Sequence, residues 1–251
     1  MDDIRLFKNR MCELSREAYD GGYYTASHFL TLAEQAELVF LRREGAIGAY
    51  TLKGGFAGAE RCLALFGSEE LFGYAGEAPC VFLMIAPVQM KFADTLSHRD
   101  LLGGLMSLGI RRECLGDIVI SGNIGYLYAE ETVAPYIAET LKKVRHTDVK
   151  VETIDTPPTA SMTLPEITEL VVASERLDAA IAAVYKLSRQ EAETHLQKGL
   201  VMIDGRLVQK SAYSLHQGEI VSVRGKGRFL FEGVTGDTRK GKLRIAVRIF
   251  R

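Results

Sequence analysis

The sequence predicts an α+β protein with three parts: a mostly helical N-terminal segment, a split βαβ middle domain and a small basic C-terminal domain. Three observations support this class. Residues 80–155 alternate strand and helix patterns in the order β-α-β-β-α-β. A proline-rich stretch, TIDTPPTASMTLPEITE, closes this region. The end of the 251-residue chain is then strongly basic, although the net charge is −1. The expected parts are an N-terminal segment at 1–76, a middle domain at 77–156, a linker at 157–173 and a C-terminal domain at 174–251.

The N-terminal segment carries apolar residues mainly at helical spacing. DIRLFKNRMCELSREAY, SHFLTLAEQAELVFLRRE and AGAERCLALFG are each expected to form a helix. Between the last two, GAYTLKGG is expected to form a short strand that ends in a glycine turn. The segment is therefore predicted to be mainly helical, with a minor strand component.

The middle domain is defined by four strand patterns and two helix patterns. The expected strands are CVFLMIAPVQ, GDIVIS, GYLYAE and DVKVETI, and the expected helices are SHRDLLGGLMSLGI and TVAPYIAETLKKV. Ferredoxin-like and RRM-like domains have this order of elements. Tyr126 and Tyr128 share one face of their strand, and an RRM stacks RNA bases on aromatic side chains of its sheet. Because no stretch matches the aromatic-rich RRM pattern, we expect both tyrosines to pack in or beside the core.

The stretch HRDLLGGLMSLGIRRECLGDI resembles an active site because charged residues flank a glycine pair. A kinase catalytic loop needs an asparagine five residues after the aspartate of its His-Arg-Asp motif, but Leu105 stands there. Consecutive helical residues also diverge by about 100° each, so the three charged residues of the motif would not meet at one atom. We expect instead a helix capped by Ser97, with Asp100 in its first turn. The glycine pair would let another backbone approach closely, and no catalytic residue is predicted.

Several classes of protein find no support in the sequence. The N-terminus lacks the apolar core of a signal peptide, and the longest apolar run, CVFLMIAPVQM, is too short to cross a bilayer. Cys12, Cys62, Cys80 and Cys114 lie far apart and form no metal-binding motif. We therefore expect a cytoplasmic protein with reduced cysteines and without a membrane segment, metal, cofactor or small-molecule substrate.

The C-terminal domain has the clearest local signals. Residues 175–251 contain 15 Lys and Arg against 8 Asp and Glu, whereas residues 1–174 have a net charge of −8. A basic block of this kind favours a polyanion-binding module. Ser188 and Glu191 form a capping-box pattern at the start of a helix. Asp204-Gly205 is typical of a type I′ hairpin turn, and GEIVSVR and KLRIAVRIF alternate as strands do.

The basic residues of this domain form a pattern that suits an anion. Arg189 takes the first helical position, where the helix dipole disfavours a cation by about 0.3–1 kcal/mol and favours a phosphate. An anion site and a merely exposed arginine have equal weight at this residue. In RGKGR, glycines separate Arg224, Lys226 and Arg228, which allows them to follow a nucleic-acid backbone. The outer face of KLRIAVRIF is expected to extend this positive surface through Lys242, Arg244 and Arg248.

Residues 175–228 resemble the S4 RNA-binding domain, a small fold of two helices and a sheet. The resemblance is carried by RLD at 176–178, SRQEA at 188–192, KGLVMIDG at 198–205 and GEIVSVR at 218–224. Asp204 and Glu219 depart from the Asn and Asp that are usual in that family. The resemblance implies an RNA-contacting surface that contains Arg176, Lys186, Ser188, Arg189, Lys198 and Lys210.

Over nearly its full length the chain resembles the YlmH family of bacterial S4-domain proteins. Four motifs carry this resemblance: GGFAGAER at 54–61, HRDLLGGLMSLGIRRECLGDI at 98–118, ERLDAAIAAVYKLSRQEA at 175–192 and SVRGKGRF at 222–229. The resemblance implies a non-catalytic factor that binds the large ribosomal subunit, through rRNA and peptidyl-tRNA, in quality control of stalled translation. It also implies a protein partner that tails the stalled chain.

Secondary candidates for RNA contact are Arg99, Arg111 and Arg112, which lie in the second of these motifs. Two other functions stay open from the sequence. An RNA-modifying enzyme with an unrecognised catalytic domain would need a deep pocket in which His98 and Asp117 converge. An adaptor linked to cell division would keep its partners when RNA is removed.

Overall fold

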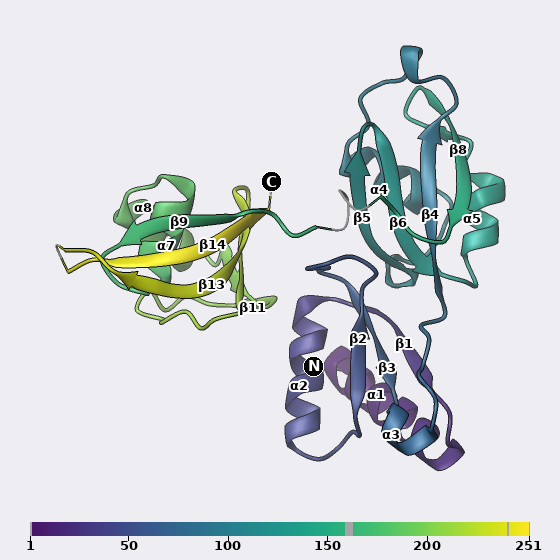
Figure 1. Ribbon diagram of the computed structural model, residues 1–251, viewed down its shortest axis with the longest axis horizontal. Coiled ribbons are helices and arrows are strands. Elements are labelled where there is room, and N and C mark those ends of the chain that lie inside the picture. The colour runs from purple at the N-terminus through teal and green to yellow at the C-terminus, as the bar shows by residue number, and fades with distance from the viewer. Residues whose placement is uncertain (1, 159–162, 240, 251) are drawn as a thin grey trace. The chain divides into compact units, whose positions relative to one another are not determined.

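The computed structural model describes residues 2–158, 163–239 and 241–250 and divides into two compact units, Met1–Thr163 and Leu164–Arg251 (Figure 1). Both units contain helices and sheets, which confirms the expected α+β class. All four cysteines are free thiols. Among the residues described, no helix has the length and apolar character needed to span a membrane.

The N-terminal part contains a three-stranded sheet in the order β1-β3-β2. Its elements are α1 (Asp2–Gly21), β1 (Thr25–Leu30), α2 (Leu32–Arg43), β2 (Tyr50–Lys53), β3 (Cys62–Phe66) and α3 (Glu69–Phe72). The prediction of a helix over AGAERCLALFG was wrong, because all five residues of β3 are buried in the central strand. A short, fully buried apolar run has no periodicity that separates helix from strand. The second expected helix also began too early: Ser27–Leu30 belong to β1, and a capping box of Thr31 and Glu34 starts α2.

The middle domain follows the expected order of elements. They are β4 (Cys80–Pro87), the 3-10 turn η1 (Met90–Phe92), α4 (His98–Ser107), the 3-10 turn η2 (Arg112–Cys114), β5 (Leu115–Ser121), β6 (Ile124–Glu130), α5 (Ala134–Thr140), β7 (Lys143–Val144) and β8 (Thr147–Ile154). The sheet has the order β5-β6-β4-β8-β7, with antiparallel neighbours throughout. The second helix is shorter than expected, since its last residues form β7. One face of the sheet packs on α4 and α5 through a core that includes Leu83, Ile85, Leu101, Leu105 and Ile137.

The α4 helix begins as the sequence predicts. Ser97 and Asp100 form a full capping box, in which the Ser97 hydroxyl accepts from the Asp100 amide and the Asp100 carboxylate accepts from the Ser97 amide. The reason given for the glycine pair needs correction. A side chain on Gly104 would come within 3.3 Å of the Val144 side chain, whereas Gly103 faces open space. The pair therefore makes room for side chains on one side only and admits no second backbone.

The other face of the middle sheet is covered by the N-terminal part. The ring of Phe29 on β1 meets that of Tyr128 on β6 edge to face, with centroids 5.8 Å apart. Phe82 and Phe56 extend this aromatic cluster. Tyr126 and Tyr128 are only 5% and 9% exposed, as the sequence led us to expect. The two sheets thus share one core, and this face has no exposed tyrosine platform.

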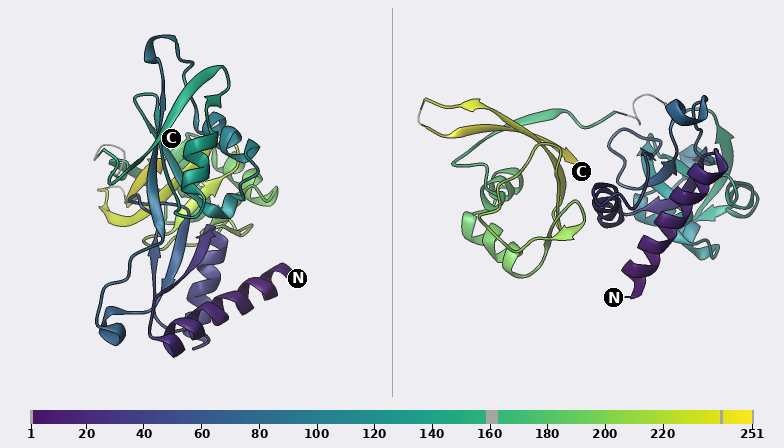
Figure 2. Two further views of the ribbon diagram at one scale, coloured as in Figure 1. Left: turned by 90° about the vertical axis from the view of Figure 1, so that its right-hand side faces the viewer. Right: turned by 90° about the horizontal axis from the view of Figure 1, so that it is seen from below.

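The C-terminal unit pairs two helices with a six-stranded antiparallel sheet in the order β11-β10-β12-β13-β14-β9 (Figure 2). Its elements are β9 (Ile167–Val172), α7 (Leu177–Tyr185), α8 (Arg189–Gln197), β10 (Val201–Ile203), β11 (Arg206–Leu207), β12 (Ile220–Val223), β13 (Gly227–Asp237) and β14 (Leu243–Phe250). Asp204 and Gly205 both have positive φ, as a type I′ turn requires. Part of the expected linker is structured, because β9 pairs with β14; residues 159–162 of that linker lie outside the described residues.

We expect replacement of Phe29 by alanine to lower the free energy of unfolding of the N-terminal unit by about 3–5 kcal/mol, because this ring is 1% exposed between two sheets. Phe92→Ala is the matched control, since its ring is 76% exposed and its loss should change stability by less than about 0.5 kcal/mol. Urea unfolding followed by circular dichroism measures both. Equal stability of the two variants would contradict the shared core.

Candidate nucleic-acid interface

The residues predicted to bind RNA in the C-terminal unit lie mostly around its two helices. Arg176 precedes α7 and Lys186 ends it, while Ser188 caps α8 and Lys198 ends it. The expected capping box of Ser188 and Glu191 is confirmed. The exposed members of the predicted set are Lys186, Ser188, Arg189, Lys198, Lys210, Arg224 and Lys226.

Backbone and charge contacts bring these basic segments to α8. The Arg224 amide donates to the Leu200 carbonyl at 2.8 Å, just beyond the end of the helix. The Gln209 side chain, next to Lys210, reaches the Gln197 carbonyl at 3.4 Å. At the other end of α8, hydrogen bonds from Ser188 lower the pKa of Glu191, and the charge of Lys226 lowers it further. Cations from three segments of the chain therefore lie near the ends of α8.

Arg189 has a partner that its sequence position did not reveal. The Asp178 carboxylate, 7% exposed, accepts hydrogen bonds from Arg176 at 3.1 and 3.2 Å and from Arg189 at 3.0 Å. Burial alone would raise the pKa of Asp178, but these two arginines outweigh burial and lower it. Arg189 at the start of α8 thus pairs with a carboxylate of the protein itself. Its guanidinium, which is 53% exposed, still borders the surface.

The expected extension of the positive surface onto the sheet is wrong for Arg248, whereas Lys242 and Arg244 are exposed. Arg248 pairs with Glu232, donates to the Pro165 carbonyl at 2.8 Å and is only 22% exposed. Arg244 lies 3.8 Å from Glu169 on β9. Arg228 is half-buried with its guanidinium over the Phe250 ring, 4.5 Å from the centroid. Strand pairing placed acidic and aromatic partners opposite these cations, so the candidate interface lies at the helices.

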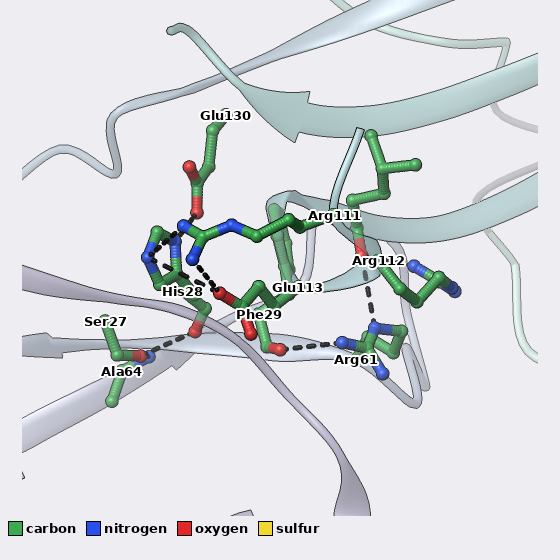
Figure 3. Close-up of polar contacts among 10 residues, drawn as sticks. Ser27, His28, Phe29, Arg61, Ala64, Arg111, Arg112, Glu113 and Glu130 are labelled. Carbon is green, nitrogen blue, oxygen red and sulfur yellow. Dashed lines mark hydrogen bonds and ion pairs between the residues drawn. The ribbon is translucent and has the colours of Figure 1, made fainter. Parts of the chain in front are cut away.

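In the N-terminal unit, Arg111 belongs to a polar cluster with His28, Glu113 and Glu130 (Figure 3). His28 Nδ1 lies 2.6 Å from a Glu130 carboxylate oxygen, and its Nε2 lies 3.4 Å from Arg111. Since a carboxylate only accepts, Nδ1 carries the proton and Nε2 accepts from Arg111. Arg111 also pairs with Glu113 at 3.0 Å. Its side chain is still 67% exposed, and its contact with RNA stays a prediction.

The same cluster is the one group in the described part of the chain with metal-ligand spacing. Atoms of His28, Cys114 and Glu130 lie within 4.8 Å of one another. Burial raises the pKa of the Cys114 thiol, and Glu130 raises it further, although the Arg111 charge opposes both. Metal ligation needs the thiolate, and the cationic Arg111 lies against the same atoms. The contacts that the structure shows here are those of a hydrogen-bonded and ion-paired cluster.

Arg112 is half-buried and has a structural role, and its contact with RNA stays a prediction. Arg112 donates to the carbonyls of Leu115 and Gly116, and Arg61 donates to those of Leu115 and Phe29 (Figure 3). Burial and the neighbouring Arg61 charge lower the pKa of Arg112 to about 10. The two arginines tie β1 of the N-terminal part to the start of β5. Arg99, by contrast, is exposed on the first turn of α4.

His98 and Asp117, which an enzyme would need in one deep pocket, line a small polar cavity. A space of about 240 Å³ is lined by Thr31, Glu60, Arg61, His98, Arg112 and Asp117. Asp117 uses its carboxylate to accept the backbone amides of Glu60 and Arg61, and the Thr31 hydroxyl donates to Glu34. The Asp117 carboxylate and the Thr31 hydroxyl therefore have structural partners, and the contacts described for the residues that line this cavity include no pairing of a nucleophile with a base.

Three comparisons show which known proteins the chain is similar to. Residues 81–157 match the family model described as "Putative RNA-binding domain in YlmH". The chain is 29% identical over 250 residues to "Ribosome-associated protein quality control protein P2" of Bacillus subtilis, covering 97% of this chain and 94% of the relative. These two matches support the resemblance of the chain to the YlmH family. A solved structure, "Cell division protein ylmH from Streptococcus pneumoniae", matches 64% of this chain and 95% of its own, with 20% identity and a TM-score of 0.49.

Two of the motifs that resemble the YlmH family meet in the N-terminal unit. GGFAGAER contributes Glu60 and Arg61 to the small polar cavity, and the stretch at 98–118 contributes His98, Arg112 and Asp117. Sequence reasoning identified the motifs but not their shared role, because their contacts join residues more than 50 positions apart. Hydrogen bonds between the two motifs join the N-terminal part to the middle domain.

We expect the ion pairs of Asp178 to stabilise the C-terminal unit. Asp178→Asn should lower the free energy of unfolding of the C-terminal unit by roughly 2 kcal/mol at neutral pH, because it removes the charge that Arg176 and Arg189 share. The lowered pKa of the native carboxyl means that its contribution is present at neutral pH and fades as pH falls through that pKa. Denaturant unfolding at neutral and acid pH should therefore show a gap that narrows in acid.

Proposed function

We propose that this protein is a non-catalytic RNA-binding factor of the large ribosomal subunit. In this proposal the S4-like C-terminal unit grips structured rRNA, and the chain also contacts peptidyl-tRNA on subunits whose translation has stalled. It would act in the cytoplasm, in quality control, alongside a factor that tails the stalled chain. The RRM-like middle domain would provide a second RNA contact.

The observation that carries this proposal is a group of exposed cations near the two ends of α8. Lys186, Lys198, Lys210, Arg224 and Lys226 come from separate segments and gather at one helix. Point charges on flexible side chains suit phosphates and RNA shape rather than base sequence. The relative in Bacillus subtilis is named for ribosome-associated quality control, and its similarity extends along almost the entire chain.

A salt titration of binding to large ribosomal subunits tests the phosphate contacts. If about five cations meet phosphates, log K should fall with log salt with a slope near −3.5 to −4.5. Replacing Lys186, Lys198 and Lys210 by glutamine should weaken binding and make the slope shallower by about 2–3 units. Arg189 is left unchanged in this variant, because its replacement would also remove an ion pair of Asp178.

The matched control removes three cations from the other end of the same unit, through Arg239→Gln, Lys242→Gln and Arg244→Gln. These residues lie at the β13–β14 hairpin, away from α7 and α8 (Figure 1). The control should keep the slope within one unit of the native protein. A flat salt response of the native protein, or equal losses in both triple variants, would contradict the proposed interface. Pull-down of protein partners that persists after RNase treatment would favour an adaptor instead.

A further inference from the structure

The sheet faces of the middle domain are covered, so an RNA site in this domain has to lie elsewhere. RRM-type domains stack bases on exposed aromatic residues of the sheet. Here one face packs on α4 and α5, and the other carries Tyr126 and Tyr128 in the core shared with the N-terminal part. Residues 81–157 nevertheless match the model of an RNA-binding domain. The exposed loops of this domain are the remaining surface to search.

The loop between β4 and α4, which we call the distal loop (residues 88–96), presents an unusual apolar group. Phe92 is 76% exposed, the highest value among the large apolar side chains that the structure describes. Val88 and Met90 beside it are 62% and 52% exposed. The Lys91 ammonium lies 5.5 Å from the centroid of the Phe92 ring. An aromatic ring and a cation are thus displayed together, unlike the scattered single apolar residues of ordinary surfaces.

A basic hairpin lies next to the distal loop. Residues 142–150, KKVRHTDVK, contain four Lys or Arg and one Asp. The rest of this unit is acidic. Lys143, Arg145 and His146 are all exposed, and Arg145 holds a positive φ of 55° in the turn. Arg145 also lies 3.7 Å from Asp100, and this contact places it beside the N-terminus of α4. The hairpin therefore aligns positive charge along one end of the domain.

Hydrogen bonds fix the distal loop against the basic hairpin. The Val88 amide donates to the Asp148 carbonyl, and the Asp94 amide donates to the Thr147 hydroxyl, both at 2.9 Å. Between the two segments lies a cleft of about 210 Å³, smaller than the roughly 300–1,000 Å³ of pockets for drug-sized ligands. It is lined by Val88, Gln89, Phe92, Ala93, His146, Thr147 and Asp148. The cleft suits a single ring system with polar groups at its edge.

We propose that this end of the middle domain binds an unpaired RNA nucleotide. The base stacks on Phe92 and enters the cleft, where the Asp148 carboxylate accepts from a base amino group, and Lys91, Lys143 and Arg145 contact the adjoining phosphates. Single-stranded binding surfaces combine the same two features, an aromatic platform and a positive track. This inference rests on the proposed function, because it names the RNA feature that the middle domain recognises. Charge complementarity favours RNA here over an apolar protein segment.

A local fluorescent probe tests the site in the full-length chain. The protein has no tryptophan, so Phe92→Trp introduces a single indole that keeps the stacking surface. A short single-stranded RNA should quench this indole, and a blunt RNA duplex of the same sequence should not. Phe40→Trp is the matched control, because Phe40 is also exposed on α2 and also has a lysine, Lys8, 5.0 Å from its ring centroid. Neither RNA should quench that variant.

Affinity measurements separate this inference from the proposed function. Phe92→Ala should weaken binding of the single-stranded RNA about fivefold or more, and Lys143→Gln with Arg145→Gln should flatten its salt dependence. Equal quenching by duplex, or no loss in Phe92→Ala, would overturn the nucleotide site. Quenching by a protein partner in the absence of RNA would do the same. The triple lysine variant of the C-terminal unit tests the proposed function alone, since it should lose large-subunit binding and keep quenching at position 92.

Discussion

The edge-to-face contact between Phe29 on β1 and Tyr128 on β6 stands at the centre of the N-terminal unit. Around it two sheets from different parts of the chain share one aromatic core. Arg61 donates hydrogen bonds to carbonyls of both the N-terminal part and the middle domain, and Arg112 donates to a carbonyl of the middle domain. Because this core occupies the face on which an RRM would display its aromatic residues, any RNA contact of the middle domain has to lie away from that sheet face. The position of the proposed nucleotide site follows from that constraint.

A second constraint organises the C-terminal unit. Asp178 is buried at the start of α7 and needs compensation, which Arg176 and Arg189 provide. This arrangement joins α7 to the start of α8 and uses two of the cations that the sequence assigned to RNA. The remaining lysines around α8 are exposed, so they can contact phosphates without a cost in folding. Charges with a structural partner and exposed charges are therefore carried by neighbouring residues of one small domain.

Local sequence signals predicted the elements whose ends carry their own chemistry. Ser97 with Asp100, and Ser188 with Glu191, form the capping boxes that their spacing indicated, and Asp204-Gly205 forms the predicted turn. The errors occurred where contacts with distant parts of the chain override local pattern. Cys62–Phe66 looked helical but is a fully buried central strand, and the segment around Ile167–Val172 looked like a linker but pairs with β14. Neither outcome is encoded within a short window of residues.

The sequence by itself determined the α+β class, the capped helices, the basic C-terminal domain and the resemblance to the YlmH family, because composition, spacing and motifs are local properties. Only the tertiary structure decided which charges are available. It paired Arg189 with Asp178 and Arg248 with Glu232, and it placed Arg111 beside His28. It also buried Tyr128 while leaving Phe92 exposed. The physical reason is that an ion pair or a buried ring depends on residues brought together from distant positions, and a charge or an aromatic residue in the sequence carries no record of its neighbours in space.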